Sequence, residues 1–573
     1  MSSSAQNTPA ARQRIVVIGG SAAGPKAAAR ARRLDETAAI TILQKAPDLS
    51  MASCGYPYYV GGFFDDRNML LCSPTGVVRD PRFFLKAKGI VARTGVEATR
   101  IDRAARLVEI RDLQTGATEE VPYDKLILAT GARPRLPPVP GVELAGVTTL
   151  QSMQDADFLR RVRDERRIRK AVIIGGGLIG VETCEALHLA GLEITVVELL
   201  PQLLTFLDWQ LAKLVENHVR AKGARVITDD GVTAFLGEDG QLRGVRLRSG
   251  AELDCELAVV AIGVIPNSGL AAAADLALGA TGGILVDEHL RTSDPDIYAA
   301  GDCLEITQLV SGAKVHAPFG DLSNLQGRVA GENAVLGDVV IFPGTIQTGI
   351  CKIFDYAAGS TGLSERAATA AGFEVETVVT ASPDKPGFMQ GKLLVTKLVA
   401  ERATGRILGA QCLGPGDVSK QLAVWAMAVR GKLTVDEMAN ADLPYAPPFS
   451  LAIDHGIAAA HVLQNKLKGR MRGISAVELH QRLASGDRPF LLDVRNPNEF
   501  EEVRLGAGER LIPLGLLRDR LAELPADKST EIVCYCKISL RGYEAARVLQ
   551  ANGWERVLVL EGGLMAWPYP LER

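Results

Sequence analysis

The stretch AVIIGGGLIGVE, residues 171–182, combines a short apolar strand, a glycine-rich turn and the beginning of a helix. Its glycines follow the pattern Gly175-x-Gly177-x-x-Gly180, which lets the backbone approach a pyrophosphate at the helix N-terminus. The next strand ends in Glu198, at about the 20-residue spacing expected of an acid that binds ribose hydroxyls. This pattern predicts a dinucleotide-binding domain.

The residues after Glu198 indicate which nucleotide this domain prefers. Leu199, Leu200 and Pro201 follow the glutamate, so no arginine stands there to hold a phosphate. The carboxylate accepts hydrogen bonds from ribose hydroxyls and repels the 2′-phosphate of NADPH. We therefore expect NADH to be preferred over NADPH.

A weaker copy of the same pattern lies near the N-terminus. The apolar strand at residues 14–20 runs into Gly19-x-Ser21-x-x-Gly24, and a helix follows. The second strand ends in Gln44, where an acidic residue usually binds the ribose; an amide can still hydrogen-bond a hydroxyl. A glycine-rich turn with no ligand is the alternative interpretation of this copy when it is taken alone.

Two further strands place the first copy in a larger arrangement. One strand closes on Thr130-Gly131 and the other on Gly301-Asp302. Two dinucleotide folds in tandem, the first split around the second, imply one tightly held and one exchangeable dinucleotide, which we expect to be FAD and NADH. The expected boundaries are 12–150 and 271–344 for the FAD-binding domain and 151–270 for the NAD-binding domain.

Length and composition limit the remaining possibilities. A chain of 573 residues is too long for one core and suggests three or four domains. Its net charge of −3 and pI of about 6.3 give no reason to expect a nucleic-acid partner. No apolar run reaches the roughly 18 residues of a membrane span. The segment 1–14 lacks the apolar region of a signal peptide, so we expect a short disordered lead.

Cysteine usage points to both compartment and chemistry. The nine cysteines are scattered singly apart from Cys534 and Cys536, which fits a reducing cytoplasm better than a disulfide framework. Cys54, in SMASCGYPYYVGG (residues 50–62), has no Cys-x-x-Cys or Cys-x-x-x-x-Cys partner. It must therefore form its disulfide, persulfide or sulfenic acid with something that arrives from outside. This indicates a small sulfur or peroxide substrate; a buried core cysteine is the alternative. No metal site is expected.

The C-terminal part of the chain divides into two blocks. Residues 345–465 form one block, 466–472 a basic linker, and 473–573 a small α/β domain. In that last domain a strand runs directly into Cys536 and then into a helix. Successive backbone N–H groups in such a loop bind anions, lower the pKa of a thiol and stabilise a persulfide. Cys534, two residues earlier on the strand, is expected to pack in the core.

These motifs resemble two known families. The first 465 residues are similar to the single-cysteine branch of the pyridine nucleotide-disulfide oxidoreductases, which includes coenzyme A disulfide reductases, NADH oxidases and NADH peroxidases. The last hundred or so residues resemble a rhodanese, and the fusion looks like the NADH-dependent coenzyme A-persulfide and polysulfide reductases. The motifs that carry the resemblance are GGSAAG (19–24), SCGYPYY (53–59), ATG (129–131), GGGLIG (175–180), AGD (300–302), YAPPF (445–449), DVRNPNEF (493–500), CKISLR (536–541) and EGGLMAW (561–567).

The resemblance implies a fold and roles for both thiols. The expected fold class is α/β, with two tandem Rossmann-like domains, an α+β dimerisation domain and a C-terminal rhodanese domain. Cys54 is expected to face the flavin, where a helix dipole favours the thiolate, and to receive electrons that pass from NADH through FAD. Cys536 is expected to carry a persulfide sulfur, with Arg541 closing its loop. Gln44 and Lys45 are expected to bind FAD.

The resemblance also implies coenzyme A as a substrate and a second subunit. The block 345–465 is expected to pair two chains into a homodimer, in which Tyr445 completes the partner's active site. A second family tyrosine is replaced at Lys385-Pro-Gly387, which weakens the expectation of activity on coenzyme A disulfide more than on a persulfide. Residues expected to bind coenzyme A or the sulfur substrate are Arg30, Arg33, Ser50, Ser53, Lys88 and Asn324.

Three functions compete on these features. The first is an NADH-dependent reductase of persulfide or polysulfide sulfur that releases sulfide. The second is an NADH oxidase or peroxidase that cycles Cys54 through sulfenic acid. The third is a sulfurtransferase or coenzyme A-responsive redox sensor with a regulatory flavin. A rhodanese domain favours the first, because peroxide chemistry needs no sulfur carrier.

Overall fold

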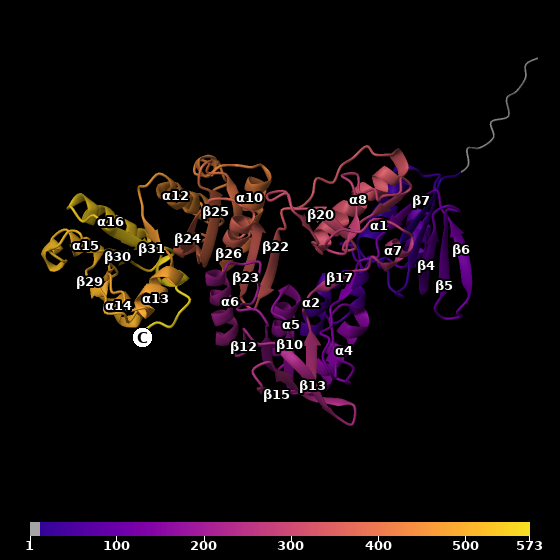
Figure 1. Cartoon of the computed structure of the whole chain (residues 1–573), viewed down its shortest axis with the longest axis horizontal. Coiled ribbons are helices and arrows are strands. Elements are labelled where there is room, and N and C mark those ends of the chain that lie inside the picture. Colours follow the sequence, from indigo (N-terminus) through magenta and orange to yellow (C-terminus); the bar gives the residue numbers. More distant parts are fainter. Residues whose placement is uncertain (1–11) are drawn as a thin grey trace, which may run out of the picture.

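The structure is a computed structural model that describes residues 12–573. The expected disordered lead falls mostly on residues 1–11, outside the described part of the chain. Figure 1 shows the C-terminal domain at one end of the molecule, an antiparallel sheet beside it, and two further domains at the other end and below. Two parallel sheets, an antiparallel sheet with helices, and a small parallel α/β domain confirm the expected fold class.

A five-stranded parallel sheet in the order β19-β7-β1-β2-β3 forms the first domain. The strand β19 belongs to the chain segment after the second domain, so the first domain is split in sequence. Four of its strands are mostly buried, as expected of parallel strands covered on both faces, whereas the edge strand β3 is partly exposed. The strands are β1 (Arg14–Ile18), β2 (Ala39–Gln44), β3 (Val91–Thr94), β7 (Lys125–Leu128) and β19 (Ile297–Ala299).

Two helices, α1 (Ala23–Leu34) and α8 (Gly320–Leu336), pack against this sheet and against each other. A Cβ atom on Gly327 would lie 2.4 Å from the carbonyl oxygen of Ala23, so the two backbones touch. This close crossing brings together segments some 300 residues apart in the sequence. Smaller elements of the domain are α3 (Pro81–Lys88), α7 (Gly269–Ala273), β4 (Val96–Asp102), β5 (Leu107–Asp112), β6 (Thr118–Pro122), β18 (Ile284–Leu285), β20 (Leu304–Thr307) and β21 (Lys314–Val315).

The second domain repeats the same design. Its parallel sheet has the order β12-β11-β10-β16-β9 and joins the first domain through the antiparallel pair β8 (Ala132–Pro134) and β17 (Val264–Pro266). The strands are β9 (Val147–Thr148), β10 (Lys170–Ile174), β11 (Glu193–Val197), β12 (Arg225–Ile227) and β16 (Leu257–Val260). They are accompanied by α4 (Met153–Glu165), α5 (Leu178–Leu189), α6 (Trp209–Ala221), β13 (Val232–Glu238), β14 (Gln241–Leu247) and β15 (Glu252–Asp254).

An antiparallel sheet in the order β22-β23-β26-β25-β24 forms the third domain. Trp425, fully buried on α10, lies in the core between the sheet and the helices. The strands are β22 (Gly349–Ile353), β23 (Tyr356–Gly362), β24 (Val375–Pro383), β25 (Leu393–Glu401) and β26 (Ile407–Gly414). The helices are α9 (Glu365–Ala370), α10 (Val418–Arg430), α11 (Val435–Met438) and α12 (His455–Leu467).

The fourth domain has a parallel sheet in the order β27-β31-β30-β28-β29. The Asp-x-Arg pair at its first long strand is a buried ion pair, in which Arg495 donates to Asp493 at 2.7 Å. The strands are β27 (Gly473–Ile474), β28 (Phe490–Asp493), β29 (Arg510–Leu511), β30 (Ile532–Tyr535) and β31 (Val557–Leu560). The helices are α13 (Ala476–Ala484), α14 (Pro497–Glu502), α15 (Leu514–Leu517), α16 (Leu540–Ala551) and the 3-10 turn η5 (Gly563–Ala566).

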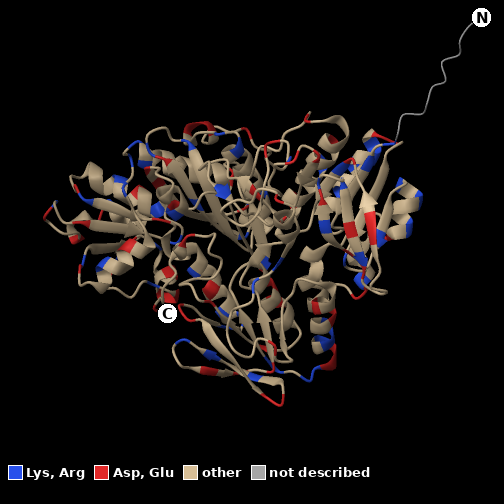
Figure 2. Ribbon diagram, turned by 45° about the vertical axis from the view of Figure 1, so that its right-hand side comes forward, with Lys and Arg blue, Asp and Glu red and all other residues tan. Residues whose placement is uncertain are grey.

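Charged residues of both signs are interspersed along the whole ribbon, as Figure 2 shows. In this view neither sign dominates any one domain, in agreement with the small net charge. Within residues 12–573, every helix is too short or too polar to cross a bilayer.

Candidate active site

The two glycine turns have the same geometry. A Cβ atom on Gly19 would lie 2.0 Å from the Ala129 carbonyl oxygen, and one on Gly24 would lie 1.9 Å from the Gly19 carbonyl oxygen. The second turn repeats these contacts, at 2.4 Å for Gly175 and 2.0 Å for Gly180. No side chain fits at these four positions, so the fold itself requires these glycines.

The middle position of each turn differs from the outer ones. Gly177 has no atom within 4 Å of a Cβ position, and Ser21 at the equivalent place is exposed. The protein therefore leaves room for a side chain here, and serine is compatible with the first turn. Both turns leave a helix N-terminus accessible to a pyrophosphate, so the residues present fit a dinucleotide at each.

Gln44 and Glu198 end the second strand of their respective sheets and hold the turns beside them. The Gln44 Oε1 atom accepts a hydrogen bond from the Gly20 amide at 2.8 Å. Glu198 accepts from the Gly176 amide at 2.7 Å and from the Leu200 amide at 2.8 Å. A carboxylate has about four acceptor positions, so Glu198 keeps about two for ribose hydroxyls.

The charge on Glu198 leads to a prediction of nucleotide preference. A 2′-phosphate placed near this carboxylate would be repelled by about 4 kcal/mol at 4 Å in a partly screened site. Even a third of that energy corresponds to about tenfold in kcat/KM, so we expect NADH to exceed NADPH by at least about tenfold. Steady-state kinetics with both nucleotides test this; equal efficiencies contradict it. Glu198→Gln keeps the shape of the side chain and is expected to narrow the ratio.

Thr130 and Gly131 lie where the chain leaves the first domain. The Thr130 hydroxyl donates to the Asn267 carbonyl at 2.7 Å, and the Asn267 amide donates back to the Thr130 carbonyl at 3.0 Å. Gly131 has a positive φ of 67°, which favours glycine. These hydrogen bonds join the segment in which the chain leaves the first domain to the segment in which it returns from the second.

Gly301 and Asp302 follow β19 and contact helix α8. The Gly301 amide donates to Gln326 at 2.8 Å, and the Ser323 hydroxyl donates to Asp302 at 2.9 Å. Burial raises the pKa of Asp302. The carboxylate that the Ala-Gly-Asp motif predicts therefore lies at the N-terminal half of α8.

Cys54 lies beside the same helix terminus. It occupies the short turn η1 (Ser53–Gly55) before α2 (Tyr56–Gly61), and its side chain is exposed. Its Sγ atom is 3.5 Å from the position of a Cβ on Gly320, the first residue of α8. The thiol is therefore accessible from outside the protein and faces the part of the first domain that carries Asp302.

The expectation that a helix dipole lowers the pKa of Cys54 is wrong, because the other groups around the thiol act in the opposite direction and dominate. The pKa of this thiol is raised, first because surrounding protein limits its hydration and then because the Glu182 and Asp302 carboxylates repel a thiolate. Both carboxylates reach the thiol from segments distant in sequence. A substrate that reacts with Cys54 must therefore meet a thiol that first gives up its proton.

The sequence interpretation missed Glu182 and Tyr58. The Tyr58 hydroxyl donates to Glu182 at 3.2 Å and joins α2 to α5. Burial raises the pKa of Glu182 to about 7, even though the Tyr58 hydrogen bond lowers it. A carboxyl group that titrates near neutral pH beside a reactive thiol can hold a proton there. Glu182 is the last residue of the glycine-rich segment 171–182, and this position was the sequence signal that could have identified it.

The residues expected to bind coenzyme A lie at the outer ends of α1 and α3. Arg33 is exposed, and the Lys88 carbonyl accepts a hydrogen bond from Arg32 at 3.1 Å, so the two helix ends adjoin. Arg30 instead forms an ion pair with Glu332 on α8, at 2.6 Å. That pair occupies much of its guanidinium.

The remaining predicted positions surround the first glycine turn and the thiol. Ser50 is buried and its amide donates to the Gly20 carbonyl at 2.7 Å, whereas Ser53 is exposed next to Cys54. The Asn324 amide donates to the Gly320 carbonyl at 2.8 Å within α8. Lys45 is exposed and forms an ion pair with Glu97 at 2.7 Å.

Tyr445 lies on the exposed loop before α12. Among the described residues, no contact joins it to Cys54 of the same chain. Phe449 in the same loop is 73% exposed, and Phe388, after the Lys385-Pro-Gly387 stretch, is 76% exposed. Both aromatic side chains therefore leave a large apolar surface exposed on the single chain.

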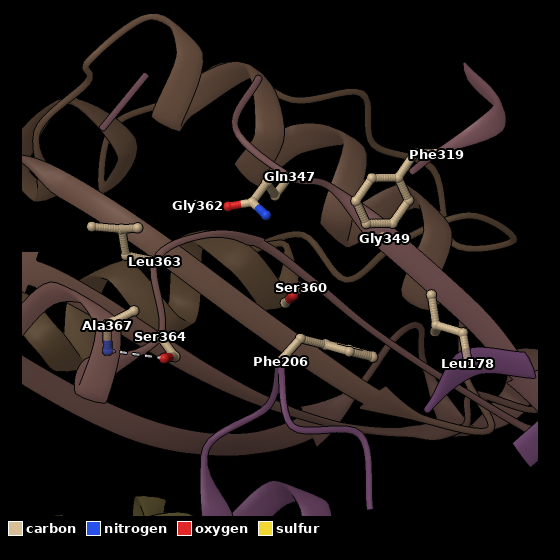
Figure 3. Close-up of a pocket in the computed structure, with 10 residues that line it drawn as sticks. All are labelled: Leu178, Phe206, Phe319, Gln347, Gly349, Ser360, Gly362, Leu363, Ser364 and Ala367. Carbon is tan, nitrogen blue, oxygen red and sulfur yellow. Dashed lines mark hydrogen bonds between the residues drawn. The ribbon is translucent and has the colours of Figure 1, made fainter. Parts of the chain in front are cut away.

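A pocket of about 210 Å³ lies where three domains meet (Figure 3). Leu178 at the start of α5, Phe206 and Phe319 line it together with residues of the third domain. Phe319 directly precedes Gly320 and packs against Gly349 of β22, whose Cβ position is 3.3 Å from its ring. The pocket therefore adjoins both the second glycine turn and the Cys54 environment.

The Cys536 loop connects the end of β30 at Tyr535 to the start of α16 at Leu540. Ser539 adopts a left-handed conformation with φ of 77°, and Arg541 donates two hydrogen bonds of 2.7 Å to Glu499. The pKa of Arg541 is raised by these bonds to Glu499 and, after an opposing effect of burial, by the nearby Cys536 sulfur. Cys534 is fully buried in the core, as expected.

The fully buried Cys536 lines a second cavity, of about 470 Å³. Six residues of the fourth domain and three residues of the third domain line this cavity. Those of the fourth domain are Cys536, Lys537, Ile538, Leu540, Arg541 and Met565; those of the third are Pro383, Gly391 and Leu393.

The fold and these two thiols define a dinucleotide-dependent oxidoreductase that carries a sulfur-handling domain. Residues 13–317 match the family model of pyridine nucleotide-disulphide oxidoreductases, and residues 348–456 match the dimerisation domain of the same family. Residues 475–568 match the rhodanese-like domain. The chain belongs to the pyridine nucleotide-disulphide oxidoreductases, with a C-terminal rhodanese domain, and this family implies FAD and NAD(P)H as cofactors.

Three relatives are similar over most of the chain, and two of them cover both the reductase and the rhodanese parts. The chain is similar to the NAD-dependent persulfide reductase of A. fulgidus, with a TM-score of 0.92 and 43% identity over 97% of this chain and 100% of that one. Reduced Bacillus anthracis CoADR-RHD superposes with a TM-score of 0.90 at 34% identity, over 97% and 98% of the chains. The NAD(P)H coenzyme A polysulfide/persulfide reductase of Pyrococcus horikoshii is 31% identical over 79% of this chain and 99% of its own.

Proposed function

We propose that the protein reduces persulfide or polysulfide sulfur with NADH and releases sulfide. The observation that carries this proposal is a pair of thiols in distinct surroundings: Cys54 stands alone and exposed beside Gly320, and Cys536 lies in a loop that opens into a cavity. A lone thiol needs a sulfur or peroxide substrate from outside, and the rhodanese domain, whose thiol carries sulfur, favours the sulfur substrate. The names of the similar persulfide reductases support the same substrate class.

The reaction at Cys54 proceeds in two steps. Cys54 attacks the inner sulfur of a persulfide R–S–SH, forms a mixed disulfide with R–S, and HS⁻ leaves with the pair of electrons of the broken S–S bond. FAD, when bound, supplies two-electron reduction by NADH, which returns the disulfide to the Cys54 thiol and R–SH. Cys54 gives up its proton before the attack, because the thiolate is the nucleophile.

The test is the stoichiometry of anaerobic turnover with the FAD-loaded protein. Incubated with NADH and coenzyme A persulfide or sodium tetrasulfide, the enzyme is expected to release one sulfide for each sulfane sulfur reduced, with one NADH consumed. Turnover with hydrogen peroxide or oxygen, and none with sulfur substrates, would instead support the peroxidase or oxidase. The absence of turnover with either substrate would leave a sulfur carrier or sensor.

We also propose that the active unit is a cytoplasmic homodimer and that Arg33 and Lys88 bind phosphates of coenzyme A. Ion pairing with phosphate suits these basic side chains at adjoining helix ends, of which Arg33 is exposed and Lys88 is partly exposed. Exposed apolar residues gather on the third domain, which is the family's dimerisation domain, and favour a contact between two chains. These residues are Phe388, Met427, Tyr445, Phe449 and Ile453.

Light scattering of the purified protein tests the dimer. We expect a mass of twice the 61.1 kDa of the chain. Because a charge on an apolar interface is costly to bury, Phe449→Asp combined with Met427→Asp is expected to give a monomer with sharply reduced turnover. Leu516→Asp, on the exposed side of the fourth domain, is the matched control and should leave the mass unchanged. A fully active wild-type monomer would contradict the proposal.

A further inference from the structure

The segment that supports the Cys536 loop is bound to both neighbouring domains. The Gln210 side chain on α6 donates to the Ala566 carbonyl at 2.7 Å, and Asn217 donates to the Pro568 carbonyl at 2.8 Å. From the third domain, the Val379 amide donates to the Glu561 carboxylate at 3.0 Å. The rhodanese domain is therefore docked through the segment 561–568, next to its own active loop.

The same segment holds the backbone of the Cys536 loop. The Leu564 amide donates to the Cys536 carbonyl, and the Met565 amide donates to the Lys537 carbonyl, both at 3.1 Å. A Cβ atom on Gly563 would lie 2.4 Å from the Cys536 carbonyl oxygen, so the two backbones are in contact. A displacement of this segment at the domain interface would therefore move the thiol loop.

A buried ion cluster ties this segment to the third domain. The Lys466 ammonium lies 2.6 Å from Glu561 and 3.0 Å from Glu376, and it donates to the Thr377 carbonyl. None of the three charged side chains is more than 17% exposed. Burial lowers the pKa of Lys466, but the two carboxylates more than offset this and the net shift is upward. A cation between two carboxylates in such a place is held firmly.

Gly473 gives a second indication that the position of Glu561 matters. A Cβ atom on Gly473 would lie 2.0 Å from the Glu561 Oε1 atom. Any side chain at this residue would therefore displace the carboxylate from Lys466. The chain keeps the place free although Gly473 begins a strand, where glycine is unfavourable.

The docked domains together shape the cavity in front of Cys536. Leu393 and Pro383 of the third domain face Ile538 and Met565 across it, and Lys537 and Arg541 of the fourth domain bring positive charge. Its volume of about 470 Å³ is in the range of small-molecule sites, and a short inorganic polysulfide would occupy a small part of it. Apolar walls near cationic groups suit an organic stem that ends in an anionic sulfur.

We infer that the β24–β25 hairpin of the reductase forms one wall of the Cys536 pocket and selects organic persulfides over inorganic sulfur donors, and that Lys466 positions this wall. The inference rests on the proposed role of Cys536 as a sulfur carrier. In the transfer step the Cys536 thiolate attacks the outer sulfur of R–S–SH. A Cys536–S–SH persulfide forms, the donor S–S bond breaks, and R–S⁻ leaves with the electron pair, so no further oxidant or reductant is needed.

Loading of Cys536 tests the wall directly. In the FAD-loaded full chain with Cys54→Ser, intact mass spectrometry follows persulfide formation on Cys536 over time. The donors are glutathione persulfide and sodium tetrasulfide, without NADH. Leu393→Trp fills the pocket and is expected to slow loading from glutathione persulfide at least about tenfold, while loading from tetrasulfide changes less than about threefold. Leu516→Trp, exposed on the fourth domain and not among the residues that line the cavity, should change neither rate.

Lys466 variants test the positioning role. Lys466→Met leaves Glu561 and Glu376 without their cation, and we expect it to reduce the preference for glutathione persulfide over tetrasulfide at least about fivefold, with rescue by Lys466→Arg. Leu393→Ala provides a milder variant if Leu393→Trp does not fold. Equal changes with both donors, or an unchanged preference in both Leu393 variants and Lys466→Met, would overturn the inference. Because loading needs no NADH, these outcomes are independent of whether the wild-type enzyme releases sulfide.

Discussion

Cys54→Ser is expected to lower NADH-driven sulfide release by at least about 1000-fold with every sulfur substrate. The hydroxyl of serine does not form the mixed disulfide through which electrons reach the substrate. The glycine turns at Gly19 and Gly175 lie on other segments, so the variant should still bind FAD and should still be reduced by NADH. Sulfide assays under anaerobic conditions and the flavin absorbance after mixing with NADH give the two measurements.

The matched control for this variant is Cys72→Ser, because Cys72 is a partly exposed thiol in the same region of the chain. It should keep turnover close to that of the wild type. Sulfide release by Cys54→Ser at the wild-type rate would show that the chemistry occurs at the flavin itself or at Cys536. Loss of flavin in Cys54→Ser would mean that the thiol has a structural role.

Cys536→Ser is expected to have the second large effect, and on a different reaction. It should abolish transfer of sulfur from thiosulfate or polysulfide to an acceptor thiol, by at least about 1000-fold, because the persulfide carrier is removed. Reduction of a small persulfide at Cys54 should continue within about threefold, since that thiol lies in another domain. Transfer assays with cyanide or a thiol as acceptor, beside NADH-dependent sulfide release, separate the two activities.

Cys534→Ala is the control for this second variant. Cys534 lies two residues earlier on β30 and is buried in the core, so its loss should affect stability and leave sulfur transfer intact. If Cys536→Ser lost both activities together, the sulfur would have to pass through Cys536 before reaching Cys54. If it lost neither, the rhodanese domain would serve only to dock the enzyme.

Local patterns in the sequence were sufficient to predict the fold class. The contacts of Gly24 with the Gly19 carbonyl oxygen and of Gly180 with the Gly175 carbonyl oxygen lie within a few residues, and residue type and spacing are good guides to such short-range geometry. Other parts of these turns depend on distant backbone, because Gly19 and Gly175 are required by the carbonyl oxygens of Ala129 and Ala261. The loop at residues 536–541 is likewise held by the segment 561–568.

The electrostatics of the site could not be predicted in this way. The expected low pKa of Cys54 is wrong because Glu182 and Asp302 lie beside it, from segments 128 and 248 residues further along the chain. Likewise, the sequence places Lys466 in a basic linker, whereas it lies in the last turn of helix α12 and pairs with Glu561 in a buried cluster. Such effects depend on which distant groups the fold brings together, and no local pattern contains that information.

The split of the first domain has a consequence for synthesis of the chain on the ribosome. Its sheet is not complete until β19 has emerged, and α1 lacks its neighbouring helix until α8 follows. The second domain is continuous in sequence and can fold first. Meanwhile the N-terminal part of the first domain keeps an open sheet edge, which is prone to non-native pairing. A chain arrested near residue 270 should accordingly show a protease-resistant second domain and a labile first one, and the nascent flavoprotein should depend on chaperones until about seventy more residues have been added.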